Sequence, residues 1–143
     1  MPTVPRTRIL VAVAVGGCVG TVARYELAQA DPVGSGHIPW ATFTANMIGS
    51  LVLGIAVVVL VDSRRSTLIL RPLVGVGFCG GLTTFSTWMV ESVLLTRDGE
   101  AATAALYLGV SLVVGLGAVL VGMTVARWVV HAAAPTFDAE HDE

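Results

Sequence analysis

Gly80-Gly-Leu-Thr-Thr-Phe-Ser-Thr87 is a glycine- and hydroxyl-rich stretch within a long apolar run, residues 68–95. Each glycine disfavours a helix by about 1 kcal/mol relative to alanine. The threonine and serine hydroxyls can bond to backbone carbonyls and open the helical ladder. The spacing leaves two alternatives open. The run is either a continuous helix whose hydroxyls bond to the carbonyl four residues back, or a helix that is broken at this stretch.

The composition of the whole chain indicates a membrane protein. Of the 143 residues, 55% are hydrophobic and only 13% are charged, whereas soluble domains carry about 25% charged residues. A spanning helix needs roughly 20 mostly apolar residues. The segments that meet this requirement are residues 9–28, 38–61, 68–95 and 102–130. We therefore predict an all-α integral membrane protein, with one four-helix domain over residues 1–131 and a disordered acidic tail over residues 132–143.

Some patterns that suggest other structures have plainer explanations. Arg6 and Arg8 before the first apolar segment imitate a cleavable signal, but three more apolar segments follow, so we expect a retained helix. The GxGxxG match at residues 75–80 follows no predicted strand, which argues against a dinucleotide site. Cys18 and Cys79 form no CxxC motif, so we expect both to be small buried packing residues. The sequence contains no basic patch, so it does not predict a nucleic-acid partner.

The arginines predict how the helices are oriented in the membrane. Four helices joined by short turns place both termini on one side. By our count six arginines lie on that side and two, Arg24 and Arg97, on the other. The six are Arg6, Arg8, Arg64, Arg65, Arg71 and Arg127. Because positive residues concentrate in cytoplasmic loops, we predict a multi-pass protein of the cell membrane with its termini preferentially cytoplasmic.

A break in the third helix would mark a functional region. Non-helical backbone at membrane depth is tolerated only where it is buried in protein or lines a cavity. The freed carbonyls of such a break commonly coordinate a small cation. Phe85 and Trp88, three residues apart, would share a helix face just after it. Their positive ring edges could meet a small anion, or the two rings could simply pack in the core or face lipid.

Neutral hydrogen-bonding side chains recur on two other helices. Asn46 interrupts an apolar run, and Thr42 lies one turn earlier on the same face. A buried amide needs a partner, so Asn46 either makes an interhelical hydrogen bond or replaces part of the hydration of an anion. Tyr107, Ser111 and Gly115 recur every four residues on the last helix. Their two hydroxyls could guide an anion along the helix or serve polar helix packing.

Two charged residues lie within or near the spans, where charges are functional candidates by default. Arg24 could attract anions at a vestibule, pair with Glu26, or brace the fold. Glu91 could line a water-filled mouth or anchor a polar network.

Four stretches together resemble the Fluc (CrcB) family of fluoride channels. They are residues 16–25, 42–50 and 75–87, and Tyr107 with Ser111. The resemblance covers about residues 9–130. It implies an antiparallel two-subunit channel that passively exports fluoride through two pores and lowers fluoride toxicity in the cytoplasm. It implies that the protein is not an enzyme.

The resemblance also implies roles for single residues. Gly80 and Thr83 are similar to the backbone-carbonyl ligands of a structural sodium ion, which is shared by both subunits and not transported. The fluoride-pore residues that it implies are Asn46, Phe85, Trp88, Tyr107 and Ser111. The residues expected to support them are Arg24, Thr42, Ser86, Thr87 and Glu91. Trp88 departs from the family, which often has a second phenylalanine there, and Gly115 stands where another hydroxyl is frequent.

Other functions remain open from the sequence. A four-helix, proton-coupled exporter of cationic drugs would need a carboxylate deep in the membrane, whereas Glu26 and Glu91 lie near helix ends. A non-transporting subunit that only completes an assembly is a second alternative. The arginine bias favours one fixed orientation and hence a heterodimer with a homologous subunit, whereas an antiparallel homodimer favours little bias. Both assemblies remain open.

Overall fold

The computed structural model describes residues 4–31, 37–62 and 68–132, and every regular element in these ranges is helical. The elements are α1 (Arg6–Ala30), α2 (Trp40–Asp62), the π-helical η1 (Pro72–Phe78), α3 (Cys79–Leu82), α4 (Phe85–Arg97) and α5 (Ala101–Ala132). The predicted disordered tail, apart from Ala132, and the two arginines at positions 64 and 65 lie outside the described residues.

Within the described residues, four helical spans are long and apolar enough to cross a membrane. They are Arg6–Ala30, Trp40–Leu60, Pro72–Arg97 and Ala101–Ala132. The shortest has 21 residues. At about 1.5 Å per residue it extends roughly 30 Å, the thickness of a bilayer's hydrocarbon core. The predicted all-α class with four spans is confirmed, and the chain is a multi-pass membrane protein.

The helix ends differ by a few residues from the predicted limits. Helix α1 begins at Arg6 and ends at Ala30, because a helix continues into polar residues beyond the apolar core of its span. The first element of the third span begins at Pro72, four residues later than predicted. Proline suits the first turn of a helix, where its missing N–H would have no partner anyway.

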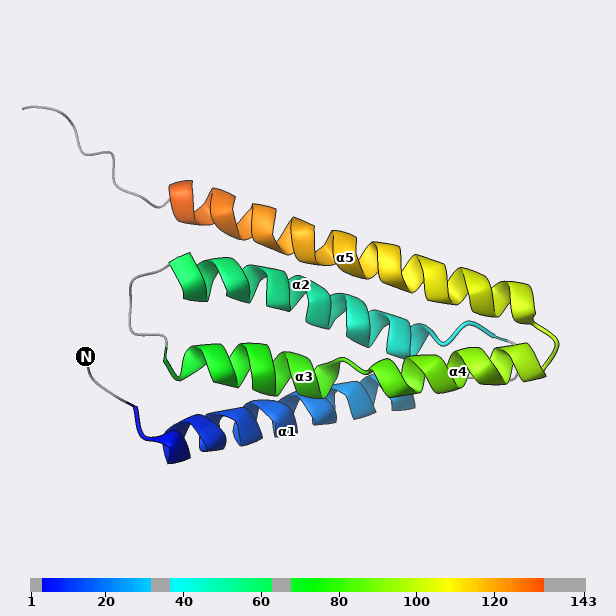
Figure 1. The fold of residues 1–143 in the computed structure, drawn as a ribbon, viewed down its shortest axis with the longest axis horizontal. Coiled ribbons are helices and arrows are strands. Elements are labelled where there is room, and N and C mark those ends of the chain that lie inside the picture. The colour runs from blue at the N-terminus through cyan, green and yellow to red at the C-terminus, as the bar shows by residue number, and fades with distance from the viewer. Residues whose placement is uncertain (1–3, 32–36, 63–67, 133–143) are drawn as a thin grey trace, which may run out of the picture.

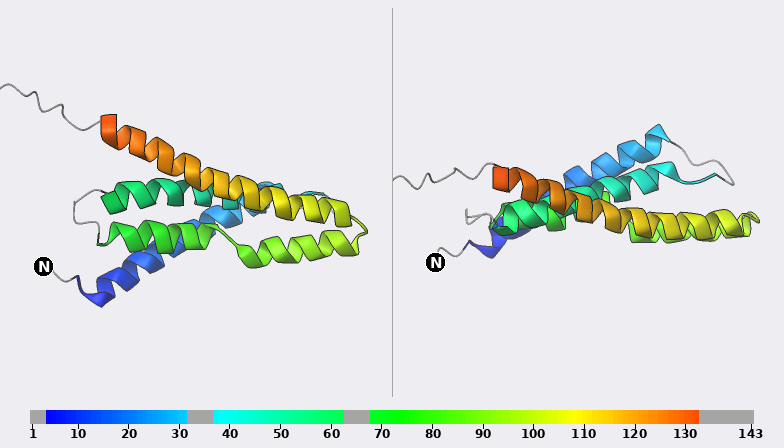
Figure 2. Two further views of the ribbon diagram at one scale, coloured as in Figure 1. Left: turned by 45° about the horizontal axis from the view of Figure 1, so that its top comes forward. Right: turned by 90° about the horizontal axis from the view of Figure 1, so that it is seen from above.

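The spans pack in a definite order along the bundle. Helix α2 packs against α5, α1 packs against η1 and α3, and α4 packs against α5. The N-terminal end of α1 and the C-terminal end of α5 lie at the same end of the bundle (Figure 1). The two views in Figure 2 show that α1 and α4 diverge beyond the C-terminal end of α3. The third span therefore packs mainly against α1 before residue 82 and mainly against α5 after residue 85, while α2 contacts both parts.

Glycines let α1 contact the third span backbone to backbone. A Cβ atom on Gly16 or Gly20 would overlap backbone carbonyls of the third span, and one on Gly81 would lie 2.5 Å from the Gly17 carbonyl oxygen. Such approach is typical of small residues spaced four apart in membrane helices. The pairs Gly16/Gly20 and Gly77/Gly81 thus face one another, and they fix α1 beside the glycine-rich stretch.

The outer faces of the helices are apolar. Leu10, Val113 and Trp128 are 68%, 69% and 74% exposed in the single chain, which suits contact with lipid or with another subunit. Cys79 is buried as expected, whereas Cys18 is exposed, so the expectation of burial is wrong for Cys18. The physical reason is that a thiol is apolar enough to face lipid, and an apolar run does not distinguish the lipid-facing side from the protein-facing side.

Candidate functional site

The glycine- and hydroxyl-rich stretch is where the third span loses its helical backbone. Helix α3 ends at Leu82, Thr83 has φ −78° and ψ 154°, and Thr84 has φ −147° and ψ 124°. These two residues are extended, and α4 begins directly after them at Phe85. The Thr84 hydroxyl accepts a hydrogen bond from the Thr87 N–H at 3.2 Å and so caps α4. We call residues 83–84 the interruption.

Asn46 of α2 provides the hydrogen-bond partners of the interruption. The Thr84 N–H donates to Asn46 Oδ1 at 2.8 Å, and Asn46 Nδ2 donates to the Thr84 carbonyl at 3.1 Å. In a continuous helix the Thr84 N–H would donate to the Gly80 carbonyl instead. The side-chain amide therefore substitutes for helical bonds and holds the interruption open. One N–H of Asn46 remains for another acceptor.

Arg24 of α1 contacts the same region from the other side. Its Nε donates to the Gly81 carbonyl oxygen at 3.1 Å, which satisfies one of the last carbonyls of α3. Of the three alternatives for Arg24, this contact agrees with a residue that braces the fold. Arg24 also lines a small cavity of about 90 Å³, together with Asp31, Thr87 and Glu91.

Glu91 of α4 is the centre of a polar network across three helices. Thr42 Oγ1 donates to Glu91 Oε1 at 2.7 Å, and the Tyr107 hydroxyl donates to Glu91 Oε2 at 3.0 Å. Thr42 and Tyr107 are only 8% and 2% exposed, so both bonds are shielded. Of the two alternatives for Glu91, an anchored polar network describes this geometry. The network ties α2, α4 and α5 together one to two turns beyond the interruption.

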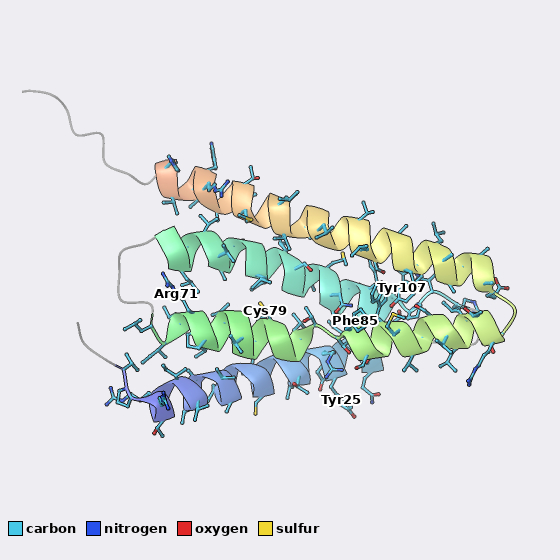
Figure 3. All side chains as sticks on the ribbon, in the orientation of Figure 1. Tyr25, Arg71, Cys79, Phe85 and Tyr107 are labelled. Carbon is cyan, nitrogen blue, oxygen red and sulfur yellow. The ribbon has the colours of Figure 1, made fainter. Side chains whose placement is uncertain are left out.

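A groove of about 460 Å³ lies between α2, the third span and α5. The predicted site residues that line it are Asn46, Gly80, Thr83, Phe85, Trp88 and Ser111. No charged side chain is among the described residues that line it. Tyr107 does not line the groove, because its hydroxyl points to Glu91 instead. Figure 3 shows Phe85 just after the interruption and Tyr107 on the neighbouring α5.

The two aromatic residues of α4 contact each other, as their spacing predicts. The ring centroids of Phe85 and Trp88 are 5.5 Å apart at an interplanar angle of 65°, which brings a ring edge toward a ring face. Phe85 is 71% exposed, whereas Trp88 packs against the buried cluster that contains Tyr107. Phe85 therefore lies on the open side of the groove and Trp88 on its inner wall.

Gly80 and Thr83 fit a site for a small hard cation. The N–H that a continuous helix would direct at the Gly80 carbonyl is bonded to Asn46, and the extended Thr83 lies at the C-terminal end of α3. Helix C-termini carry partial negative charge, and hard cations prefer oxygen ligands. A Cβ atom on Gly80 would meet nothing within 4 Å, so another group has room to approach.

The remaining hydroxyls serve the interruption, and two polar groove residues, Ser50 and Thr84, were not among the predicted site residues. Thr84 Oγ1 donates to Thr87 Oγ1 at 3.0 Å and lies 3.4 Å from Ser86 Oγ. Ser50 also lines the groove. Its position one turn after Asn46 on α2 is the signal that could have identified it. The pairing of Asn46 with Thr84 had no sequence signal, because it joins two helices far apart in the chain.

Comparison with known proteins agrees with these features. The family model described as "CrcB-like protein, Camphor Resistance (CrcB)" matches residues 11–123. The chain is 38% identical to the fluoride-specific ion channel FluC 2 of Nocardia farcinica, over 87% of this chain and 89% of that relative. It is 43% identical to the fluoride-specific ion channel FluC of Chlorobaculum tepidum, over 80% of this chain and 91% of the relative. It is 38% identical to FluC 1 of Mycobacterium bovis, over 84% of this chain and 91% of the relative. These relatives are ion channels and not enzymes, and the chain belongs to the CrcB-like family.

Proposed function

We propose that this protein is a fluoride-specific channel that exports fluoride passively across the cell membrane and so lowers fluoride toxicity in the cytoplasm. The observation that carries the proposal is the groove without charged lining residues, which is lined by two aromatic residues, an asparagine and several hydroxyl residues. The names of the relatives support it. Fluoride is small and strongly hydrated, so a path for it needs several donors arranged as weak sites from which the ion can also leave.

Different lining residues replace different parts of the hydration shell of the ion. Phe85 and Trp88 offer positive ring edges, Asn46 offers the N–H that does not bond to Thr84, and Ser111 offers a hydroxyl. Tyr107 lies one turn before Ser111 on α5 and completes the polar stripe, with its hydroxyl held by Glu91. Full charges are absent from these donors, which keeps each site weak enough to release the ion.

Export needs no coupled energy source. Hydrogen fluoride enters a cell as a neutral molecule and dissociates inside, where the anion is trapped. An inside-negative potential drives an anion outward with about 2.3 kcal/mol per charge per 100 mV. A passive, selective path through the groove is therefore sufficient to lower the cytoplasmic concentration.

A structural sodium ion that is not transported is the second part of the proposal. The carbonyl oxygens of Gly80 and Thr83 would hold it, at the end of α3 and beside the open space next to Gly80. When bound, sodium supplies positive charge that neutralises these carbonyls. Two oxygens from one chain leave the shell of a hard cation incomplete, so a second, antiparallel subunit would supply the rest.

The second subunit is either a copy of this chain or a homologue. The predicted excess of arginine on the side of the termini favours one orientation, and thus a homologous subunit inserted the opposite way. Reporter fusions at the C-terminus test this point. One orientation supports a heterodimer with cytoplasmic termini, whereas both orientations in equal amounts support a homodimer.

The drug-exporter alternative has less support from the structure. Its mechanism requires a carboxylate that exchanges protons along the transport path. Glu91 does not line the groove, and both of its oxygens accept hydrogen bonds.

A cellular experiment separates these functions. The protein, alone and with a homologous subunit, is produced in a bacterial strain that lacks its own fluoride exporters. We expect restored growth in fluoride, less retained cytoplasmic fluoride, and no change in retention of a cationic dye. The proposal would be refuted if fluoride retention stayed unchanged both with the protein alone and with the homologous subunit added, while the protein is present in the membrane.

A further inference from the structure

Arg24 places a positive charge beside the backbone of the proposed sodium site. Its Nε donates to the Gly81 carbonyl oxygen at 3.1 Å, and the contact is partly buried. Arginine stays charged in proteins and offers donors only, so it can neither bind a cation nor lose its charge to admit one. Because Gly81 directly follows Gly80, the charge of Arg24 lies beside one of the two proposed ligands.

The carbonyls at the end of α3 have different partners. The Cys79 carbonyl accepts from the Thr83 N–H at 2.9 Å and from the Thr83 hydroxyl at 2.8 Å. The Gly81 carbonyl accepts from Arg24. The N–H that a continuous helix would direct at the Gly80 carbonyl bonds elsewhere. An ion at the Gly80 carbonyl would therefore lie between two carbonyls that already have donors, one of which carries a full positive charge.

The proposed ligands bring no negative charge to balance that of Arg24. Both are backbone carbonyl oxygens, whereas calcium sites usually include several carboxylates. Among the described residues, no group of three or more His, Cys, Asp or Glu side chains could hold a metal ion. Asp31 and Glu91 line the small cavity beside Arg24, but both Glu91 oxygens accept hydrogen bonds from Thr42 and Tyr107. The full charge in contact with the end of α3 is thus the positive charge of Arg24.

From these observations we propose that Arg24 makes the sodium site selective for monovalent over divalent cations, because Coulomb repulsion is twice as strong for a doubly charged ion. This inference rests on the proposed sodium site. Unit charges about 12 Å apart, at an effective dielectric constant of about 20, interact by an amount that corresponds to roughly tenfold in affinity. Arg24 bonds to the residue next to Gly80, so its charge lies closer than that. It is then a specificity-determining residue of the site as well as a brace.

Replacing Arg24 by citrulline removes the charge and keeps the contact. Citrulline has the length of arginine and retains the Nε–H, but it ends in a neutral urea group. Arg71→citrulline is the matched control, because Arg71 Nε also donates to a backbone carbonyl, that of Leu60, at 2.6 Å. Arg71 precedes the first residue of η1, so it lies at the opposite end of this half of the third span.

Subunit assembly is the measured quantity. The full chain, in whichever assembly sodium supports, is titrated with sodium chloride or calcium chloride against choline chloride at constant ionic strength. Fluoride is left out, because it would precipitate calcium. Mass photometry gives the assembled fraction and hence the half-saturating concentration of each ion.

The charge predicts a quantitative relation between the two ions. In the wild type we expect calcium to need a concentration at least roughly tenfold higher than sodium does. In Arg24→citrulline the half-saturating concentration should fall for both ions, and the fold-change for calcium should be the square of that for sodium. Arg71→citrulline should change neither concentration. Arg24→Lys keeps the charge and alters the hydrogen bond, so it should retain the preference for sodium. A residue that only braces the fold would instead weaken the effect of both ions when it is altered.

The outcomes separate this inference from the proposed sodium site. The inference alone is overturned if calcium supports wild-type assembly as well as sodium does. The same holds if Arg24→citrulline assembles with neither ion, or keeps the wild-type ratio of the two half-saturating concentrations. Wild-type assembly that is independent of every cation would overturn the proposed sodium site itself.

Discussion

The amide of Asn46 gives the sharpest prediction, because it makes both hydrogen bonds that hold the Thr84 backbone out of the helix. Asn46→Ala leaves the N–H of Thr84 without a partner and removes one donor to the Thr84 carbonyl, which as the N-cap carbonyl of α4 still accepts the first bond of that helix. An unsatisfied buried group costs about 1–3 kcal/mol. For the one unsatisfied N–H we take the middle of this range, a loss of about 2 kcal/mol in the clamped state, or roughly 30-fold in its population.

Hydrogen exchange at the Thr84 amide measures this clamp. Protection of that amide should fall by roughly the same 30-fold, because exchange follows the local opening equilibrium. Fluoride efflux should fall with it, since the interruption and the groove are built on the same contact. Thr124→Ala is a matched control, because the Thr124 hydroxyl bonds only to the Leu120 carbonyl of its own helix, at 2.8 Å. That variant should change neither quantity.

A charged variant distinguishes the clamp from the groove. Asn46→Asp keeps an oxygen that can accept from the Thr84 N–H, but it loses the donor and adds a negative charge to the lining of the groove. Protection at Thr84 should fall less than in Asn46→Ala, while fluoride efflux should fall more. If Asn46→Ala leaves the Thr84 amide fully protected, the reasoning about the clamp is refuted.

Further predictions concern helix packing, the Glu91 network and the subunit interface. Gly20→Ala should cost about 2–3 kcal/mol by forcing α1 away from the third span, whereas Gly117→Ala, which has open space, should leave the thermal unfolding temperature unchanged. Tyr107→Phe removes one of two donors to Glu91 and should lower stability by about 1.5–3 kcal/mol, measured by the loss of monodisperse protein on heating. Gly80→Ala has room within one chain, so it should spare folding but weaken the sodium-dependent subunit assembly, read by mass photometry with sodium or with an organic cation. If assembly is unchanged in the Gly80→Ala variant, the second subunit contacts a part of the chain other than Gly80.

The sequence predicts much of the fold because the relevant signals are local. Apolar length alone locates all four spans. A spacing of three places Phe85 and Trp88 in contact. Cys18 was misplaced because an apolar run has the same composition on its lipid-facing and protein-facing sides.

The site is less predictable because its key contacts join distant segments. Spacing alone leaves a broken and a continuous third helix both open. The Thr83 hydroxyl does donate to the Cys79 carbonyl four residues back, as in the continuous alternative, yet the backbone of Thr83 and Thr84 is extended. The extended backbone depends on Asn46 and Arg24, which come from two other helices. Tyr107 and Ser111 share a face of α5, but Glu91 draws only the Tyr107 hydroxyl away from the groove, and no pattern within α5 indicates that difference.

Fluoride efflux from proteoliposomes is the most direct test of selective conduction through the groove. Vesicles hold equal fluoride and chloride, an inside-negative potential is imposed with potassium and valinomycin, and both anions are followed with selective electrodes. We predict rapid release of fluoride, retention of chloride, and loss of fluoride release in Asn46→Asp. Equal release of both anions, or no release of fluoride with or without a homologous subunit, would contradict the account.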